Sequence, residues 1–373
     1  MLKIVLSCLL LITCFSSYAV KNVIIVTLDG FRWQEVFHGA DLKIIESKKF
    51  VENSAELKKQ FWADSQQQRR ELIMPFLWQT IVKKGVLIGN RDIGSNMSVS
   101  NEWYFSYPGY SEIFTGIADN RINSNEKKLN SNVTFLEWLN NQPKYGHKLA
   151  AFGSWDVFPY IFNRPRSHLY INAGFEPASG YKLSSSIKLL NQLQTEIPSP
   201  WENVRLDSFT YRFAKDYLLK KKPRVMSISL GETDDFAHDG HYDQYLRSAR
   251  RSDQFIGDLW QTIQHTAGYK NNTVLVITTD HGRGSSIADW QHHASALAVK
   301  TYMKNLTTFP NGIVGSNHIW FAAIGPGIAN KGQLKTSIEL KQNQIAATVL
   351  TLLGENPHAF NPKAGKAITE ILQ

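Results

Sequence analysis

The chain has 373 residues, of which 43% are hydrophobic and 20% are charged, and its formal net charge is +9 at pH 7. This hydrophobic content is sufficient for a large core and excludes an intrinsically disordered chain. The positive charge is spread out, since the basic runs Lys127-Lys128 and Lys220-Lys221-Lys222 are short and expected to be solvated. The composition therefore argues against a dedicated nucleic-acid-binding protein.

Residues 1–19 have the pattern of a secretory signal peptide. Lys3 precedes an apolar run from Ile4 to Phe15, and Ser17-Tyr18-Ala19 has the small residues of a cleavage site. Cys14 ends a sequence that resembles a lipoprotein site, but the bulky Thr13 disfavours that alternative. We therefore expect an exported protein, either periplasmic or secreted.

The mature chain is predicted to be a single catalytic domain over residues 20–373. No stretch in it approaches the roughly 20 apolar residues that cross a bilayer, so no transmembrane segment is expected. Both cysteines, Cys8 and Cys14, lie inside the signal. Any metal site in the mature protein must therefore use histidine, aspartate and glutamate ligands.

The predicted strands and helices alternate along the chain. Apolar runs predict strands at 23–28, 86–89, 147–152, 223–230, 274–279 and 318–324, and helices are predicted at 75–85, 106–116, 134–139, 242–266 and 342–353. Residues 40–70 are polar without a clear period and are expected to form a long surface excursion. The alternation indicates an α/β fold, a central, mostly parallel sheet between two helical layers.

Several predicted strands end on polar residues that suit a metal. Asp29 follows the first strand, Asp280 and His281 follow the strand at 274–279, and Asp234 with His238 follow the strand at 223–230. His318 stands at the start of the last predicted strand. Because ligands of an α/β protein gather at the carboxyl ends of its strands, the set predicts two metal sites at one edge of the sheet.

Ser106 begins a tight turn into a short helix that ends at Gly116. A hydroxyl at a helix start lies near free backbone N–H groups, which favour an anion such as a phosphoryl group. The alternative is that Ser106 is only a helix cap.

In these features the sequence resembles the alkaline phosphatase superfamily, particularly its nucleotide pyrophosphatase/phosphodiesterase branch. The matching motifs, in the family's order, are Asp29-Gly30, Ser106-Tyr107-Pro108, Asp234 with His238, Asp280-His281-Gly282 and the late His318. The resemblance implies an alkaline phosphatase-like three-layer α/β/α fold, two zinc or manganese ions and a small phosphorylated substrate.

The resemblance also implies residue roles. Asp29, Asp280 and His281 would hold one metal, with Ser106 as the nucleophile bound to it, and Asp234, His238 and His318 would hold the other. Asn125 would steady a phosphoryl oxygen, although a turn asparagine is the alternative. The family's Pro-Asn-His run is Pro108-Gly109-Tyr110 here, and the branch usually has threonine where this chain has Ser106.

Other polar residues near these motifs have open interpretations. Arg283 follows the metal pair and is a candidate substrate contact, with a surface arginine as the alternative. His241, His292 and His293 lie near ligand segments but are not expected to be ligands. Asp235 is a candidate second-layer neighbour of Asp234.

The function predicted is hydrolysis of phosphoric monoesters or diesters through a phosphoseryl intermediate. A sulfatase is the nearest alternative, but Ser106-Tyr107-Pro108-Gly109-Tyr110 lacks the arginine of the sulfatase motif. A phosphoglycerate mutase-like activity does not fit the signal peptide. A non-catalytic binding protein does not fit the complete set of ligands. The sequence leaves the oligomeric state open.

Overall fold

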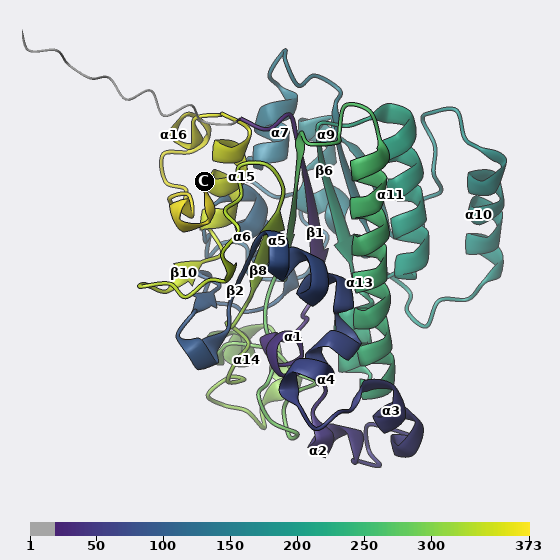
Figure 1. Cartoon of the computed structure of the whole chain (residues 1–373), viewed down its shortest axis with the longest axis vertical. Coiled ribbons are helices and arrows are strands. Elements are labelled where there is room, and N and C mark those ends of the chain that lie inside the picture. Colours follow the sequence, from purple (N-terminus) through teal and green to yellow (C-terminus); the bar gives the residue numbers. More distant parts are fainter. Residues whose placement is uncertain (1–18) are drawn as a thin grey trace, which may run out of the picture.

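The structure is a computed structural model that describes residues 19–373. The predicted signal peptide therefore lies outside the described residues, except for Ala19. An eight-stranded sheet crosses the molecule in the order β5-β4-β6-β1-β7-β8-β2-β9 (Figure 1). Its strands are β1 (Asn22–Leu28), β2 (Val86–Ile88), β4 (Leu149–Gly153), β5 (Tyr170–Ala173), β6 (Val225–Leu230), β7 (Thr273–Thr278), β8 (Phe321–Ile324) and β9 (Gly332–Gln333). A small second sheet pairs β3 (Met97–Ser98) with β10 (Leu340–Lys341).

The sheet is mostly parallel, as predicted. The strands β5, β4, β6, β1 and β7 run parallel to one another, while β8 is antiparallel to both of its neighbours. Every residue of β1, β6 and β7 is buried, which explains their continuous apolar sequences. Because β6, β1 and β7 are adjacent, the segments that follow Leu230, Leu28 and Thr278 emerge side by side at one edge.

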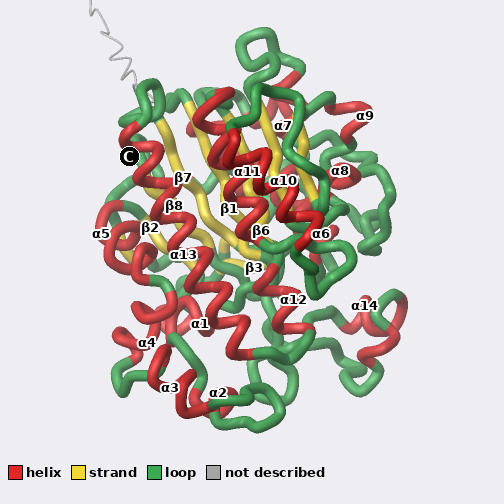
Figure 2. The backbone as a smooth tube through the Cα atoms, turned by 90° about the vertical axis from the view of Figure 1, so that its right-hand side faces the viewer, coloured by secondary structure: helices red, strands yellow, loops and turns green. Residues whose placement is uncertain are grey.

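Helices cover both faces of the sheet, so the fold has the predicted three layers (Figure 2). One face carries α1 (Trp33–His38), α2 (Leu42–Ile45), α3 (Ser54–Phe61), α4 (Gln66–Ile73), the π-helical turn η1 (Leu77–Ile81), α5 (Val82–Lys84), α10 (Ser185–Glu196), α11 (Asp207–Lys221), α12 (Glu232–His238) and α13 (Tyr242–His265). The other carries α6 (Ser106–Thr115), α7 (Phe135–Asn140), α8 (Phe158–Ile161), α9 (Arg164–Ser167), α15 (Gln344–Leu352), α16 (Pro357–Phe360) and η4 (Thr369–Ile371).

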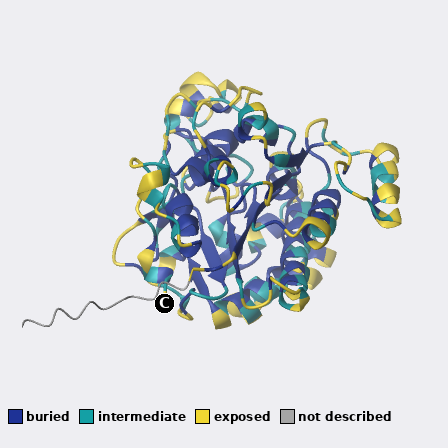
Figure 3. Ribbon diagram, turned by 90° about the horizontal axis from the view of Figure 1, so that it is seen from above, coloured by how far each residue is buried: buried dark blue, intermediate teal, exposed yellow. Residues whose placement is uncertain are grey.

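The alternation of side chains along β1 shows how the two cores are separated. Ile24, Val26 and Leu28 join one core cluster, whereas Val23 and Ile25 join the other. In Figure 3 the strands form a buried centre, and α10 lies at the periphery. None of the helices among the described residues is long and apolar enough to cross a membrane.

The sequence prediction missed some elements. Where a long surface excursion was expected at residues 40–70, the chain forms α2, α3 and most of α4, and β5, α10 and α11 were not predicted. The helices α3 and α4 bury only Leu57, Phe61 and Ile73, so their apolar periodicity is weak. Outside the layers lie η2 (Arg91–Ile93), α14 (Ala296–Thr301) and η3 (Lys304–Leu306).

Candidate active site

The edge of the sheet at β6, β1 and β7 gathers the polar residues that follow these strands. Asp29 comes directly after β1, Asp280 and His281 come after β7, and Asp234 lies in α12 after β6. Asp29, Asp280 and His281 are all at most 5% exposed. Buried carboxylates are costly unless a cation or hydrogen bonds compensate them, so this arrangement needs a partner of positive charge.

The first cluster consists of Asp29, Asp280, His281 and Ser106. His281 Nε2 lies 3.4 Å from Asp29 Oδ1 and 3.4 Å from Asp280 Oδ2. Ser106 Oγ lies 3.2 Å from the same nitrogen and 3.4 Å from Asp29 Oδ1. Ligand atoms about 2.0–2.1 Å from a tetrahedral metal are about 3.3 Å apart. The spacing of these four side chains therefore fits one divalent ion.

Hydrogen bonds around this cluster leave Asp280 Oδ2 and His281 Nε2 available to bind a metal ion. Asp280 Oδ1 accepts the N–H of Gly30 at 3.0 Å, whereas its buried Oδ2 has no hydrogen-bond partner among the described residues. Asp29 Oδ2 accepts the hydroxyl of Tyr110 at 3.1 Å. His281 Nδ1 lies 2.9 Å from the carbonyl oxygen of Gly282, which favours a proton on Nδ1 and a free lone pair on Nε2.

The charges of this cluster perturb one another. Burial, and then Asp234, raise the pKa of Asp29, and burial together with Asp29 raises the pKa of Asp280. Burial alone would lower the pKa of His281, but Asp280, Asp29 and Asp234 outweigh it and raise that pKa to about 9. Such mutual repulsion of acids is what a bound cation would relieve.

The second cluster consists of Asp234, His238 and His293. His238 Nε2 lies 3.1 Å from Asp234 Oδ2 and 3.0 Å from His293 Nε2, and His293 Nε2 lies 3.7 Å from Asp234 Oδ1. His293 Nδ1 lies 3.0 Å from the carbonyl oxygen of Tyr104, which again directs Nε2 inward. Asp234, His281 and His293 also form a group of potential metal ligands, so the two clusters adjoin.

The structure places His293, and not His318, beside Asp234 and His238. His318 precedes β8 and forms an isolated bridge with Ser98. Burial and then Arg91 lower the pKa of His318 to about 4, and the acid that faces it is Glu339. We therefore take His293, in place of the expected His318, as the candidate ligand beside Asp234 and His238. No periodic sequence pattern marks His293 as a ligand. Its closeness in sequence to His281 was the one signal that could have indicated it.

Arg283 is neither on the surface nor on the cavity wall. Its side chain is fully buried, and its guanidinium donates to the carbonyl oxygen of Asp234 at 2.9 Å and to Asp234 Oδ1. Burial would raise the pKa of Asp234, but Arg283 and His238 hold it well below the usual value. The predicted substrate contact of Arg283 is thus replaced by an ion pair that fixes Asp234.

Helix α6 presents Ser106 at its first residue, and every residue of this helix is buried. Asn125 Oδ1 accepts the N–H of Tyr107 at 3.0 Å, so Asn125 lies at the start of the same helix. Among the described residues, the side-chain nitrogen of Asn125 has no protein partner, which leaves it free to donate to a substrate oxygen. Sequence reasoning thus located both residues near each other.

A cavity of about 490 Å³ opens onto these side chains. Its wall includes Asp29, Ser106, Asn125, Asp234 and His238, and also Tyr302. Among the described residues that line it are five carboxyl side chains but a single lysine, Lys127, and no arginine. An anionic substrate would be repelled by this wall, so the charge balance supports bound cations.

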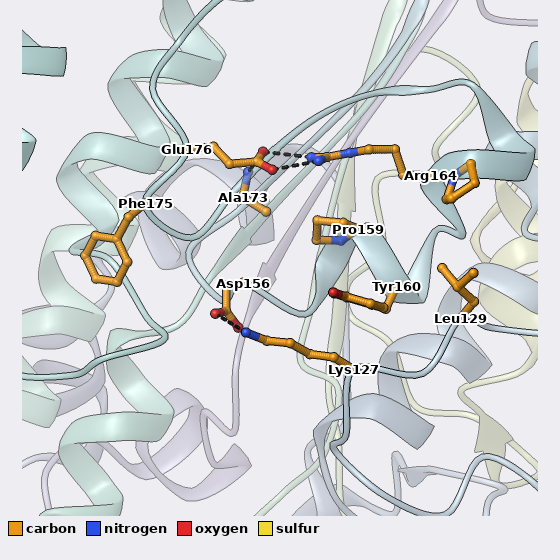
Figure 4. Close-up of a pocket in the computed structure, with 10 residues that line it drawn as sticks. Lys127, Leu129, Asp156, Pro159, Tyr160, Arg164, Ala173, Phe175 and Glu176 are labelled. Carbon is orange, nitrogen blue, oxygen red and sulfur yellow. Dashed lines mark hydrogen bonds and ion pairs between the residues drawn. The ribbon is translucent and has the colours of Figure 1, made fainter.

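Figure 4 shows the lining of a second cavity, of about 570 Å³. Both are lined by Lys127 and Asp156, whose side chains form an ion pair at 2.6 Å. Leu129, Pro159, Tyr160 and Phe175 give the second cavity apolar surface, and an ion pair between Arg164 and Glu176 closes one side. The combined space exceeds what a single phosphate group requires.

The sequence of this chain matches the model of a known protein family. The family model of type I phosphodiesterases and nucleotide pyrophosphatases matches residues 45–311. No curated protein sequence matches the chain.

Solved structures show the same fold at low sequence identity. Wild-type alkaline phosphatase PafA is 11% identical, with a TM-score of 0.55, and the match covers 95% of this chain and 99% of PafA. A protein of the alkaline phosphatase superfamily from Vibrio parahaemolyticus is 14% identical, with a TM-score of 0.54 and coverage of 95% and 71%. A putative sulfatase from Bacteroides thetaiotaomicron is 11% identical, with a TM-score of 0.54 and coverage of 94% and 74%.

Proposed function

Since the chain belongs to the type I phosphodiesterase / nucleotide pyrophosphatase family, we propose that it is an exported hydrolase of phosphoric esters that uses Ser106 as its nucleophile and two divalent metal ions. The observation that carries this proposal is the position of the Ser106 hydroxyl. It lies at the start of α6, lines the cavity, and is 3.2 Å from His281 Nε2 and 3.4 Å from Asp29 Oδ1.

The two clusters define the proposed ligand sets. Asp29, Asp280 and His281 would hold one ion together with Ser106, and Asp234, His238 and His293 would hold the other. Nitrogen and oxygen ligands without cysteine suit zinc and also accommodate manganese. Bound there, the ions would act as Lewis acids that lower the pKa of the serine hydroxyl and neutralise charge on the phosphoryl group.

The protein's own groups account for the rest of the reaction. Ser106 Oγ attacks phosphorus, gives up its proton, and the bond from phosphorus to the ester oxygen breaks. The leaving alcohol takes up a proton. Water then attacks the phosphoseryl group, which releases phosphate, or a phosphomonoester from a diester, and restores the serine. In this proposal the Asn125 amide and Lys127, which line the cavity together with Ser106, bind the non-bridging oxygens.

Diesters are the preferred substrate class in this proposal. A monoester carries one organic group, whereas a diester keeps a second one that must be accommodated beside the reacting phosphorus. The second cavity shares Lys127 and Asp156 with the wall of the first, and its volume of about 570 Å³ has room for such a group. This argument from space favours diesters over monoesters.

The test compares the purified parent with Ser106→Ala on p-nitrophenyl phosphate, bis-p-nitrophenyl phosphate and p-nitrophenyl sulfate, alongside metal analysis. We expect about two zinc or manganese ions per chain, faster turnover of the phosphodiester, and a loss of at least about 10³-fold in Ser106→Ala. Ser111→Ala is the matched control, because Ser111 lies on the same helix but its hydroxyl accepts a hydrogen bond from the Asn130 amide instead of lining the cavity. A metal-free parent that cleaves neither phosphoester refutes the proposal, and cleavage of the sulfate alone identifies a sulfatase.

A further inference from the structure

The segment from Ala294 to Ile313 forms a separate small lobe next to the candidate active site. It contains α14 and η3, and its ends are tied together by a bridge between Ser295 and Gly312. In Figures 1 and 2, α14 lies away from the main sheet. The lobe has its own hydrophobic cluster, made of Trp103, Phe105, Ala294, Ala298, Val299, Leu306 and Ile313.

Phe105 connects this lobe to the nucleophile. It is fully buried in the lobe's cluster and immediately precedes Ser106, as the N-cap residue of α6. The ring of Tyr302, at the end of α14, stacks on Phe105 with 5.3 Å between the centroids and an angle of 29°. The lobe is therefore packed against the residue that starts the nucleophile helix.

Tyr302 also contacts the proposed phosphoryl-binding residue. Its hydroxyl accepts the backbone N–H of Asn125 at 3.1 Å. One aromatic side chain thus bridges Phe105 and Asn125, which flank the position where the phosphoryl group would bind. Nothing in the sequence indicated this contact, because Tyr302 is remote from both residues along the chain.

The exposed surface of Tyr302 distinguishes it from the other apolar residues of the cavity wall. Trp155, Val157 and Val204 are only 8%, 2% and 4% exposed, whereas Tyr302 is 39% exposed. Among the apolar residues that line this cavity, Tyr302 therefore has the largest exposed fraction. An aromatic ring held by stacking on one side and by a hydrogen bond at its hydroxyl is a preorganised contact for a flat apolar group.

We propose that the lobe is a specificity cap and that Tyr302 binds an aromatic organic substituent of the phosphoester, in contact with its ring. This inference rests on the proposed function, since it assigns the substituent of the ester that Ser106 would cleave. The ring supplies the contact with the substituent, and the hydroxyl positions Asn125. The two tasks are separable by substitution.

The experiment measures binding of phenylphosphonate and methylphosphonate to the metal-loaded parent by titration calorimetry. We expect phenylphosphonate to bind roughly two- to tenfold more tightly, as an aromatic contact allows. Tyr302→Phe keeps this preference, whereas Tyr302→Ala reduces it at least about twofold. On p-nitrophenyl phosphate, Tyr302→Phe lowers kcat more than it changes KM, because it releases Asn125.

Leu297→Ala is the matched control, since Leu297 lies on α14 and is 38% exposed. It should keep both the preference and the turnover of the parent. An equal preference in the parent and in Tyr302→Ala overturns the inference while leaving the proposed function intact, provided that the parent binds both phosphonates. If the parent binds neither phosphonate and cleaves no phosphoester, both proposals fail.

Discussion

Adding a single methyl group at Gly109 should move Ser106, on α6, away from Asp280 within the first cluster. Gly109 lies in α6, one turn after Ser106, and faces the segment that follows β7. A Cβ atom at this position would lie 2.4 Å from the carbonyl oxygen of Asp280 and 3.2 Å from its Cβ. The contact is with backbone, which cannot rotate away, so α6 or the Asp280 segment must move.

The size of the required movement follows from the contact distance. An ordinary van der Waals contact begins near 3.4 Å, so Gly109→Ala must separate the two segments by about 1 Å. Misplacing a reacting group by about 1 Å costs roughly 10²-fold in rate. Overpacking costs about 1–3 kcal/mol, but alanine is about 1 kcal/mol better than glycine within a helix. We therefore expect a large loss of activity with a much smaller loss of stability.

The assay is kcat/KM for bis-p-nitrophenyl phosphate, together with urea unfolding and metal content. Gly146→Ala is the matched control, because the nearest atom to a Cβ there, outside the adjacent residues, would be the carbonyl oxygen of Pro143 at 3.7 Å. Gly109→Ala should lose about 100-fold in kcat/KM, and Gly146→Ala should keep the parent's value. Parental activity in Gly109→Ala would refute the argument that α6 and the Asp280 segment must stay in contact.

Three further predictions address the ligands, the substrate and the stability. His293→Ala should lose about one metal ion per chain, whereas His318→Ala should retain the parent's metal content; the opposite result would restore His318 as the ligand. Lys127→Gln should raise KM for phosphoesters roughly tenfold, because Lys127 is the one lysine among the described residues that line the cavity, where no arginine stands; an unchanged KM contradicts this role. Burial raises the pKa of Asp253 to about 7, against two backbone hydrogen bonds and Arg250, so the folded protein holds a proton that the unfolded chain releases near pH 4. The free energy of unfolding that this proton contributes is fully present below about pH 4 and falls by about 1 kcal/mol per pH unit as the pH rises to about 7. Urea unfolding at several pH values should show this slope in the parent and not in Asp253→Asn. The same slope in both proteins would exclude this role of Asp253.

The strand ends show what the sequence alone determined. The apolar runs before Asp29 and Asp280 are continuous because both faces of a parallel sheet are covered, and this local property placed the two acids at strand ends. The alternation of strands and helices then predicted the three layers. The sequence also located Ser106 at a helix start, since a turn with proline and glycine precedes a short apolar stretch.

Tertiary structure decided which side chains from the connecting segments meet. His318 precedes β8, and because β8 runs antiparallel to β7 the start of β8 lies at the same edge as Asp280. The strand β7, however, separates β8 from β1 and β6. The loop that carries His293 returns to the cluster instead. Arg283 could not be assigned from sequence either, because only the folded chain turns it inward onto Asp234.

The surface helices and the cap had the weakest sequence signal. The helices within residues 40–70 bury few apolar side chains, so packing stabilises them more than their own periodicity does. Tyr302 reaches Phe105 and Asn125 only because the lobe of residues 294–313 folds back over the start of α6. Local sequence determines strands, helices and their polar ends, whereas the contacts that complete the site depend on the path of the loops between them.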